Sequence, residues 1–178
     1  ELIIGGQQVI VPAMIILVVI IAPIVEEFAK GLGVRGSKKH ISEEEDGIVY
    51  GAAAGFGFAA TENLFYELAA LQEHGEAAFI ATAAVRAITG NFLHATASGI
   101  LGYGMGRMYR QRRSIFSLIP YFFAAVLLHA LFNLLAVITF GAAVIVTLVF
   151  AFFAMRYTVK RIRYLDEAPE FQPGGGPP

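Results

Sequence analysis

Acidic, imidazole and amide side chains stand at four places in a chain that is otherwise strongly apolar. They are Glu26 with Glu27, Glu62 with Asn63, His94, and His129 with Asn133. Ionisable groups inside a membrane span are costly, so they indicate function. A buried carboxylate can move protons near neutral pH, an imidazole can hold a water molecule, and an amide can donate to an oxyanion. These groups are suited to hydrolysis of a peptide bond.

Two chemistries are open to these side chains. In the first, Glu27 deprotonates a water that attacks a peptide carbonyl, while His129 and Asn133 donate hydrogen bonds to the oxyanion. In the second, Glu27, His94 and His129 bind Zn²⁺ with one coordination position left for water. The HExxH signature of zincins is absent from the sequence. No GxSxG or SxxK nucleophile motif stands out either.

Lys30 bears on which glutamate is the base. It follows Glu26 by four residues, the favourable order for an ion pair on a helix. This pairing would neutralise Glu26 and leave Glu27 free, although both glutamates stay candidates. Cysteine is absent, which excludes thiolate metal sites and a cysteine nucleophile. Because the proposed Glu and His ligands have no compact spacing, the sequence slightly favours metal-independent glutamate chemistry over zinc.

The composition indicates what kind of protein positions these groups. Apolar residues make up 57% of the chain and charged residues 15%, against about 45–50% and about 25% in soluble domains. An apolar run of about 20 residues crosses a bilayer as a helix. The runs without Asp, Glu, Lys or Arg are Leu2–Val25, Gly47–Thr61, Ala87–Gly106 and Ser114–Met155. The sequence therefore predicts a polytopic membrane protein and excludes a soluble domain, a disordered chain and a nucleic-acid partner.

We expect an all-α transmembrane bundle of about five membrane-spanning helices. The third helix is long and is expected to be kinked or divided near Gly90. The tail 166–178 ends in QPGGGPP and is expected to be disordered. The expected helices are about Val9–Gly33, Gly47–Leu71, Ala78–Met108 and two within Ser114–Met155, separated by a turn near Thr139–Gly141.

The distribution of Lys and Arg indicates the orientation. These residues follow the first, third and fifth expected helices and are absent from the loops after the second and fourth. Cytoplasmic loops carry an excess of positive charge, so we expect a cytoplasmic C-terminus. An α-helix rises 1.5 Å per residue. Counted in this way, the height above the nearest cytoplasmic charges is about 20–24 Å for Glu62, His94 and His129, which is in the outer half of the bilayer. Glu27 reaches that depth only if the first helix ends late or is shifted outward.

Four short motifs, in order on successive helices, resemble a known family. They are EEFAK at Glu26–Lys30, FAATEN at Phe58–Asn63, HATAS at His94–Ser98 and HALFN at His129–Asn133. Together they resemble the PrsW intramembrane proteases, which are related to the type II CAAX-prenyl endopeptidases. The resemblance implies peptide-bond hydrolysis within the cell membrane, similar to the site-1 cleavage of membrane-bound anti-sigma factors near the outer face.

The resemblance also implies a substrate and a set of site residues. The substrate would be a single-pass or membrane-anchored protein, and residues 1–165 would form the transmembrane protease domain. Because relatives are described both as glutamate proteases and as metalloproteases, the cofactor is either none or Zn²⁺. The residues implied in catalysis are Glu26, Glu27, Glu62, His94, His129 and, at the oxyanion position, Asn133.

The motifs depart from the family pattern at two places. Lys30 stands one position before the arginine of the related EExxxR motif, and Glu62–Asn63 stand where CAAX-type relatives carry His. Roles therefore do not transfer one for one. Arg86, nearer the outer end of the third helix, is expected to be an interface residue that snorkels.

Two other functions fit parts of the same pattern. A non-catalytic scaffold of the same superfamily would also use buried polar clamps and GxxxG packing, present here at Gly51–Gly55 and Gly102–Gly106. A proton-coupled transporter would also use buried Glu and His, but it predicts inverted repeats or broken half-helices. No convincing internal repeat is present in the sequence, which favours the protease.

Overall fold

The computed structural model describes residues 2–4, 7–9, 13–139 and scattered positions between 145 and 160. Within these residues the regular secondary structure is helical except for a short antiparallel hairpin of β1 (Leu2–Ile4) and β2 (Gln7–Val9). The predicted helical architecture is confirmed, with this hairpin as the exception. Apart from the scattered positions, the fifth predicted helix lies outside the described residues, as does the tail 166–178.

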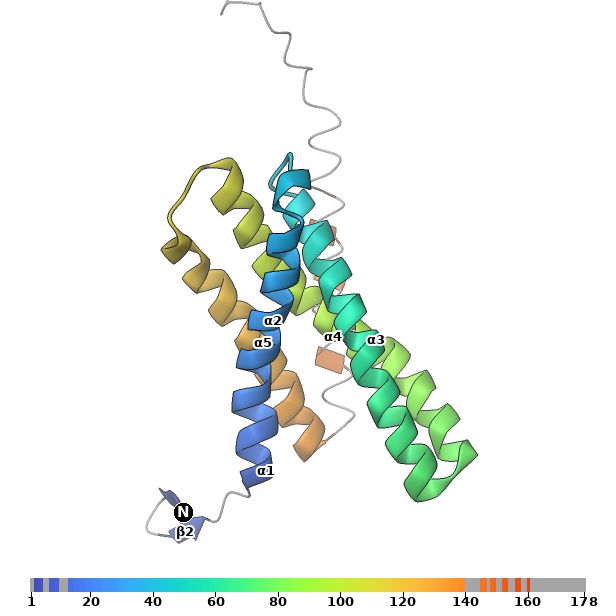
Figure 1. Cartoon of the computed structure of the whole chain (residues 1–178). Helices are drawn as coiled ribbons and strands as arrows, with labels where there is room; N and C mark the ends of the chain where they lie inside the picture. Colours follow the sequence, from blue (N-terminus) through green and yellow to red (C-terminus); the bar gives the residue numbers. More distant parts are fainter. Residues whose placement is uncertain are drawn as a thin grey trace, which may run out of the picture.

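The first helix is built from three consecutive pieces. These are α1 (Ala13–Ile16), the π-helical segment η1 (Leu17–Ile21) and α2 (Ala22–Gly36), which form one blue column in Figure 1. Pro23 lacks an N–H group, and its ring would clash with the carbonyl four residues earlier in a regular α-helix. The wider π turn lies directly before it and accommodates the ring. The predicted start near Val9 is wrong, because Val9 pairs with Leu2 in the hairpin.

The next two helices form a long antiparallel pair. They are α3 (Asp46–His74) and α4 (Glu76–Arg110), joined at Gly75, whose φ of 84° favours glycine. The predicted division of the third helix near Gly90 is wrong, because α4 runs through that position without a break. A Cβ at Gly90 would lie 2.9 Å from Asn63 Oδ1, so this glycine makes room for α3.

Glycines bring the backbones of α3 and α4 into contact beside His94. A Cβ added at Gly51 would collide with the backbone of Ser98, and one added at Gly55 with the backbone of His94. Small residues permit such close helix packing in membranes. The GxxxG spacing therefore positions the histidine-bearing part of α4.

Gly55→Ala should destabilise the protein by about 1–3 kcal/mol, because the added methyl overpacks a contact between two backbones. The thermal midpoint in detergent measures this loss. Gly57 is the matched control, since no atom lies within 4 Å of a Cβ built there. Gly57→Ala should keep or raise the midpoint, because alanine favours a helix over glycine by about 1 kcal/mol. Equal losses in the two variants would contradict this description of the α3–α4 contact.

A last described helix completes the bundle around α2. Short 3₁₀ segments η2 (Lys38–His40) and η3 (Ile115–Leu118) lie in the connections, and η3 leads into α5 (Ile119–Ile138). Figure 1 shows α2 beside α5 and the α3–α4 pair, and α2 contacts all three helices. The side chains of all four helices can therefore meet near α2.

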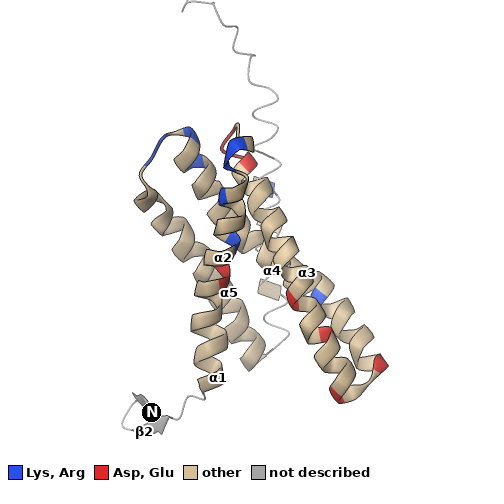
Figure 2. Ribbon diagram, viewed as in Figure 1, with Lys and Arg blue, Asp and Glu red and all other residues tan. Residues whose placement is uncertain are grey.

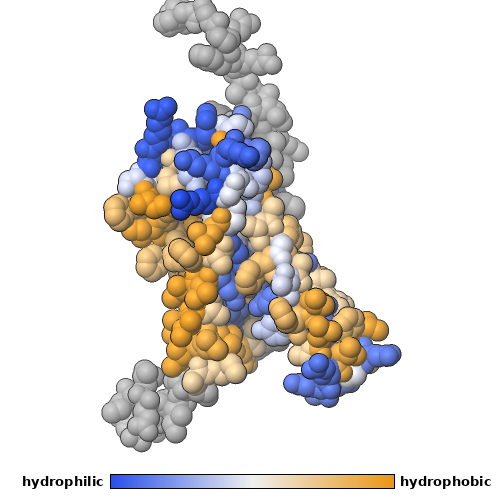
Figure 3. Space-filling model, viewed as in Figure 1, coloured by the Kyte–Doolittle hydropathy of each residue, from blue (hydrophilic) through white to orange (hydrophobic). Residues whose placement is uncertain are grey.

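Charged and apolar surfaces are separated along the bundle. Most of the Lys and Arg residues coloured in Figure 2 lie at the end that carries the η2 and η3 connections, and apolar residues cover much of the rest of the face shown in Figure 3. Among the described residues one helical stretch, Ile115–Ile138, is long and apolar enough to cross a membrane, with a mean hydropathy of 2.2. Five crossings and a polytopic bundle stay a prediction.

Candidate functional site

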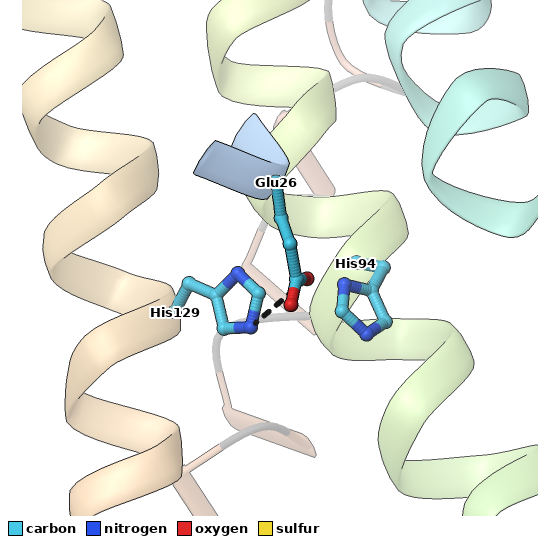
Figure 4. A group of neighbouring side chains, drawn as sticks. All are labelled: Glu26, His94 and His129. Atoms are coloured by element: carbon cyan, nitrogen blue, oxygen red, sulfur yellow. Dashed lines mark ion pairs between the residues drawn. The ribbon is translucent and has the colours of Figure 1, made fainter. Parts of the chain in front are cut away.

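A small cavity of about 70 Å³ lies where α2, α3, α4 and α5 meet. By volume it has room for several water molecules. Seven of its twelve lining residues are polar, and Figure 4 shows Glu26 between the two histidines. The polar lining residues are Glu26, Glu62, Tyr66, Arg86, His94, His129 and Asn133. The cavity thus gathers five of the six residues predicted to be catalytic, all except Glu27.

Glu26, His94 and His129 form the centre of the cavity. Their ligand-capable atoms lie within 4.8 Å of one another, and the two imidazole rings meet edge to face with centroids 4.9 Å apart. Glu26 Oε2 lies 3.7 Å from His129 Nε2. This buried oxygen has no hydrogen-bond partner among the described residues. Because an unsatisfied buried acceptor is costly, it marks an atom available to a ligand.

Glu27 is fully buried and its carboxylate is occupied by three donors. Oε1 accepts hydrogen bonds from Lys30 Nζ at 2.7 Å and His129 Nδ1 at 3.0 Å, and Oε2 accepts one from Ser98 Oγ at 3.0 Å. Lys30 forms the expected ion pair with Glu26, at 3.5 Å. The expectation that this pair leaves Glu27 free is wrong, because Lys30 also pairs with Glu27, at the shorter distance of 2.7 Å. Residues three apart on a helix are also neighbours, and here that pair faces the interior.

His94 is held between a cation and an anion. Lys30 Nζ donates to its Nδ1 at 2.7 Å, and Glu62 Oε2 lies 2.9 Å from its Nε2. An ammonium group has no acceptor, so Nδ1 accepts the hydrogen bond and Nε2 donates to Glu62. The ring is therefore fixed in orientation by contacts from α2 and α3.

Arg86 is a site residue that the sequence analysis missed. Its Nη2 donates to Glu62 Oε2 at 2.5 Å, its Nε donates to Asn63 Oδ1 at 2.8 Å, and its guanidinium lies 3.8 Å from the centre of the Tyr66 ring. The expectation of a snorkelling interface residue is wrong, since the head group turns inward to Glu62. The sequence signal that could have identified Arg86 is Glu62, an acidic residue in an apolar segment with no Lys or Arg on its own helix to pair with.

Two further contacts complete the site. Asn133 donates from Nδ2 to the carbonyl of Val18 at 2.9 Å, so its amide already has one partner. Lys30 Nζ lies 4.3 Å from the centre of the Phe58 ring, which covers the buried ammonium. Ser98, which binds Glu27, was not predicted as a site residue either.

The residues that could hold a metal ion differ from the expected set by one glutamate. In the described part of the chain the group with converging ligand atoms is Glu26, His94 and His129, whereas Glu27 was expected in place of Glu26. One carboxylate and two imidazoles are a donor set used by catalytic zinc sites. Glu27 stands behind His129, as a carboxylate that orients a histidine ligand does.

Comparison with known proteins assigns the chain to a family. No curated protein and no solved structure gives a match. The family model described as PrsW family intramembrane metalloprotease matches residues 6–158, a range that includes the whole cavity. The four motifs that resemble PrsW proteins are the segments that carry Glu26, Glu62, His94 and His129 into this cavity. The chain therefore belongs to the PrsW family of intramembrane metalloproteases.

Proposed function

We propose that the cavity around Glu26, His94 and His129 is the active site of an endopeptidase that cleaves a single-pass or membrane-anchored protein. The observation that carries this proposal is the buried Glu26 Oε2, which lacks a hydrogen-bond partner among the described residues and whose carboxylate converges with two imidazoles. Membership of an intramembrane protease family supports it. A scaffold would not need an unsatisfied carboxylate oxygen in a cavity with room for water.

The donor set fits a divalent metal ion such as Zn²⁺. Glu26, His94 and His129 would hold it, and the Glu26 oxygen that makes no hydrogen bond is the kind of atom that a metal cation would satisfy. When bound, the ion would polarise the peptide carbonyl and make a water molecule more acidic. The other residues of the site orient these three side chains.

Glu27 sets the orientation of His129. A carboxylate only accepts hydrogen bonds, so the 3.0 Å contact places the proton on His129 Nδ1 and leaves the lone pair on Nε2. That nitrogen faces Glu26 Oε2. We therefore assign Glu27 to positioning, because it does not line the cavity.

Glu62 is the cavity-lining carboxylate outside the proposed donor set. It is placed to accept a proton from the attacking water and return it to the leaving amine, as a general acid–base does. Its Oε2 is held by both Arg86 and His94, which leaves Oε1 as the proton acceptor in this proposal. Arg86 fixes the carboxylate and balances its charge.

A metal-free mechanism is the second candidate. The observation that favours it is that both ring nitrogens of His94 already have partners, Lys30 and Glu62. In this mechanism Glu26 Oε2 is the base that takes a proton from water. Incubation with a chelator separates the two candidates: metal-dependent cleavage stops and recovers on adding Zn²⁺, whereas metal-free cleavage continues.

We also propose that the protein is a multi-pass protein of the cell membrane with its C-terminus in the cytoplasm and that it cleaves near the outer face. The support is the gathering of Lys and Arg at one end of the bundle, which the positive-inside rule places in the cytoplasm. The basic residues in the two connections and in the last helical turns before them are Arg35, Lys38, Lys39, Arg107, Arg110, Arg112 and Arg113.

Cleavage of a reporter in proteoliposomes tests the proposed function. The reporter is a fluorescently tagged single-pass protein with a flexible outer juxtamembrane segment. We expect the wild type to cut it and His129→Gln to be at least about 100-fold slower, because an essential imidazole is lost. His74→Gln is the matched control, since the His74 side chain is 71% exposed at the far end of α3. Equal rates for the wild type and His129→Gln would contradict the proposal.

A further inference from the structure

The π-helical segment η1 leaves one backbone carbonyl without a donor from its own helix. The N–H group of Ala22 bonds the carbonyl of Leu17, five residues back. The Val18 carbonyl would therefore need the N–H group of residue 22, which is taken, or of residue 23. Residue 23 is proline and has no N–H group. The π turn and Pro23 together free the Val18 carbonyl.

A side chain of α5 satisfies this carbonyl. Asn133 Nδ2 donates to Val18 O at 2.9 Å. The contact is part-buried, and backbone carbonyls away from water are almost always paired, so it has a clear physical purpose. Asn133 follows His129 by four residues and lies on the same face of α5. Val18 and Asn133 both line the cavity.

We propose that Pro23 and Asn133 are a positioning pair for the active site. Pro23 frees the carbonyl of Val18, and Asn133 binds it, which fixes the first helix against α5. Val18, Ala22 and Glu26 line the cavity at successive turns, so this contact sets how Glu26 faces His129. The inference rests on the proposed function, because the geometry that the pair maintains is that of the proposed site.

The sequence analysis assigned Asn133 to a different task, donation to the oxyanion. The two assignments differ in their dependence on Pro23. An oxyanion donor contributes to the reaction whatever residue stands at position 23. A partner of the Val18 carbonyl matters only while the helix cannot satisfy that carbonyl itself.

A double-mutant cycle of Asn133→Ala and Pro23→Ala tests the pair. Asn133→Ala alone should lower the thermal midpoint by about 2–6 °C, because it leaves the part-buried Val18 carbonyl unpaired. It should also speed hydrogen exchange of residues 13–26 and slow reporter cleavage by about 10-fold or more through misplacement of Glu26. In the Pro23→Ala background, residue 23 offers an N–H group to Val18, so Asn133→Ala should change all three readouts little.

Equal effects of Asn133→Ala in both backgrounds would overturn the proposal, as would lost cleavage with an unchanged midpoint and exchange rate. The latter result would place Asn133 on the substrate. Asn133→Asp gives a second test without Pro23, since it keeps the size but removes the donor and should match Asn133→Ala. A wild-type midpoint for Asn133→Asp would also overturn the pair. Leu134→Ala is the control on α5, because Leu134 is 37% exposed.

The midpoint and exchange measurements need no catalysis, so they are repeated in a Glu26→Gln background. If the wild type does not cut the reporter, the proposed function fails. The positioning pair is then tested by the double-mutant cycle on thermal midpoints and exchange rates alone. If the effects of Asn133→Ala and Pro23→Ala simply add in the double variant, the pair is rejected.

Discussion

Glu26→Gln should slow reporter cleavage at least about 1,000-fold, within the range expected for loss of a proton-transfer group, while the thermal midpoint stays close to that of the wild type. Glutamine has the same shape, and Glu26 Oε2 makes no hydrogen bond within the described structure. The ion pair of Glu26 with Lys30, at 3.5 Å, is lost, but Lys30 keeps its closer partner Glu27, at 2.7 Å. The atoms of Glu26 converge with those of His94 and His129, so the change removes either a metal ligand or a base. Rates at saturating reporter and thermal scans of the same preparation measure the two effects.

The matched control for Glu26→Gln is Glu73→Gln. The Glu73 side chain is 71% exposed at the far end of α3, so this variant should cleave like the wild type. A Glu26→Gln variant that keeps more than a tenth of the activity would remove Glu26 from the reaction. Loss of activity with a large fall in the midpoint would indicate a structural role instead.

Glu27→Gln should have the opposite profile, with a loss of about 3–5 kcal/mol in the free energy of unfolding. Removing the closer partner of a buried ion pair is costly, and here the ammonium of Lys30, which is 3% exposed, would keep only the more distant carboxylate of Glu26, at 3.5 Å. Glu27 also accepts hydrogen bonds from His129 and Ser98, so the loss reaches α4 and α5. The thermal midpoint in detergent gives the measurement.

A second substitution checks the cause of that instability. Removing both charges, in Glu27→Gln with Lys30→Met, should recover part of the lost stability, because no unpaired charge is left buried. Failure of the double variant to recover stability would mean that the ion pair is not the source. A Glu27→Gln protein that is stable but inactive would instead support Glu27 as the catalytic base, the role favoured by sequence alone.

The sequence predicts which helices carry the site. Depth arithmetic places Glu62, His94 and His129 at similar heights, and these three residues line one cavity in the structure. The reason is that helical rise is constant and the flanking charges mark the helix ends. The same arithmetic places Glu27 closer to the cytoplasmic side than these three residues. Glu27 nevertheless contacts His129, because α2 continues to Gly36 and packs against α3, α4 and α5.

The rotation of each helix could not be predicted in the same way. Glu26 and Glu27 point about 100° apart, and spacing alone does not show which one faces the cavity. Packing of α2 against α3, α4 and α5 decides it, and it turns Lys30 toward Glu27. Arg86 was missed for a related reason, since its contact with Glu62 depends on the register of α3 against α4.

Backbone irregularity is the other feature that sequence patterns did not reveal. The sequence predicts a continuous helix from about Val9, but Val9 ends a hairpin strand and the helix contains a π-helical turn before Pro23. Apolar composition alone does not distinguish these conformations. Conversely, Gly90 suggested a break that α4 does not have, because the glycine there serves contact with Asn63.

Binding of a metal ion tests the central claim most directly, which is that Glu26, His94 and His129 together hold one ligand. Purified protein is loaded with Zn²⁺, freed of excess ion by desalting and measured by elemental analysis. We expect about one ion per chain in the wild type and in Glu73→Gln, and a small fraction of that in Glu26→Gln. A wild type that retains no ion, or a Glu26→Gln variant that retains as much as the wild type, would contradict the account.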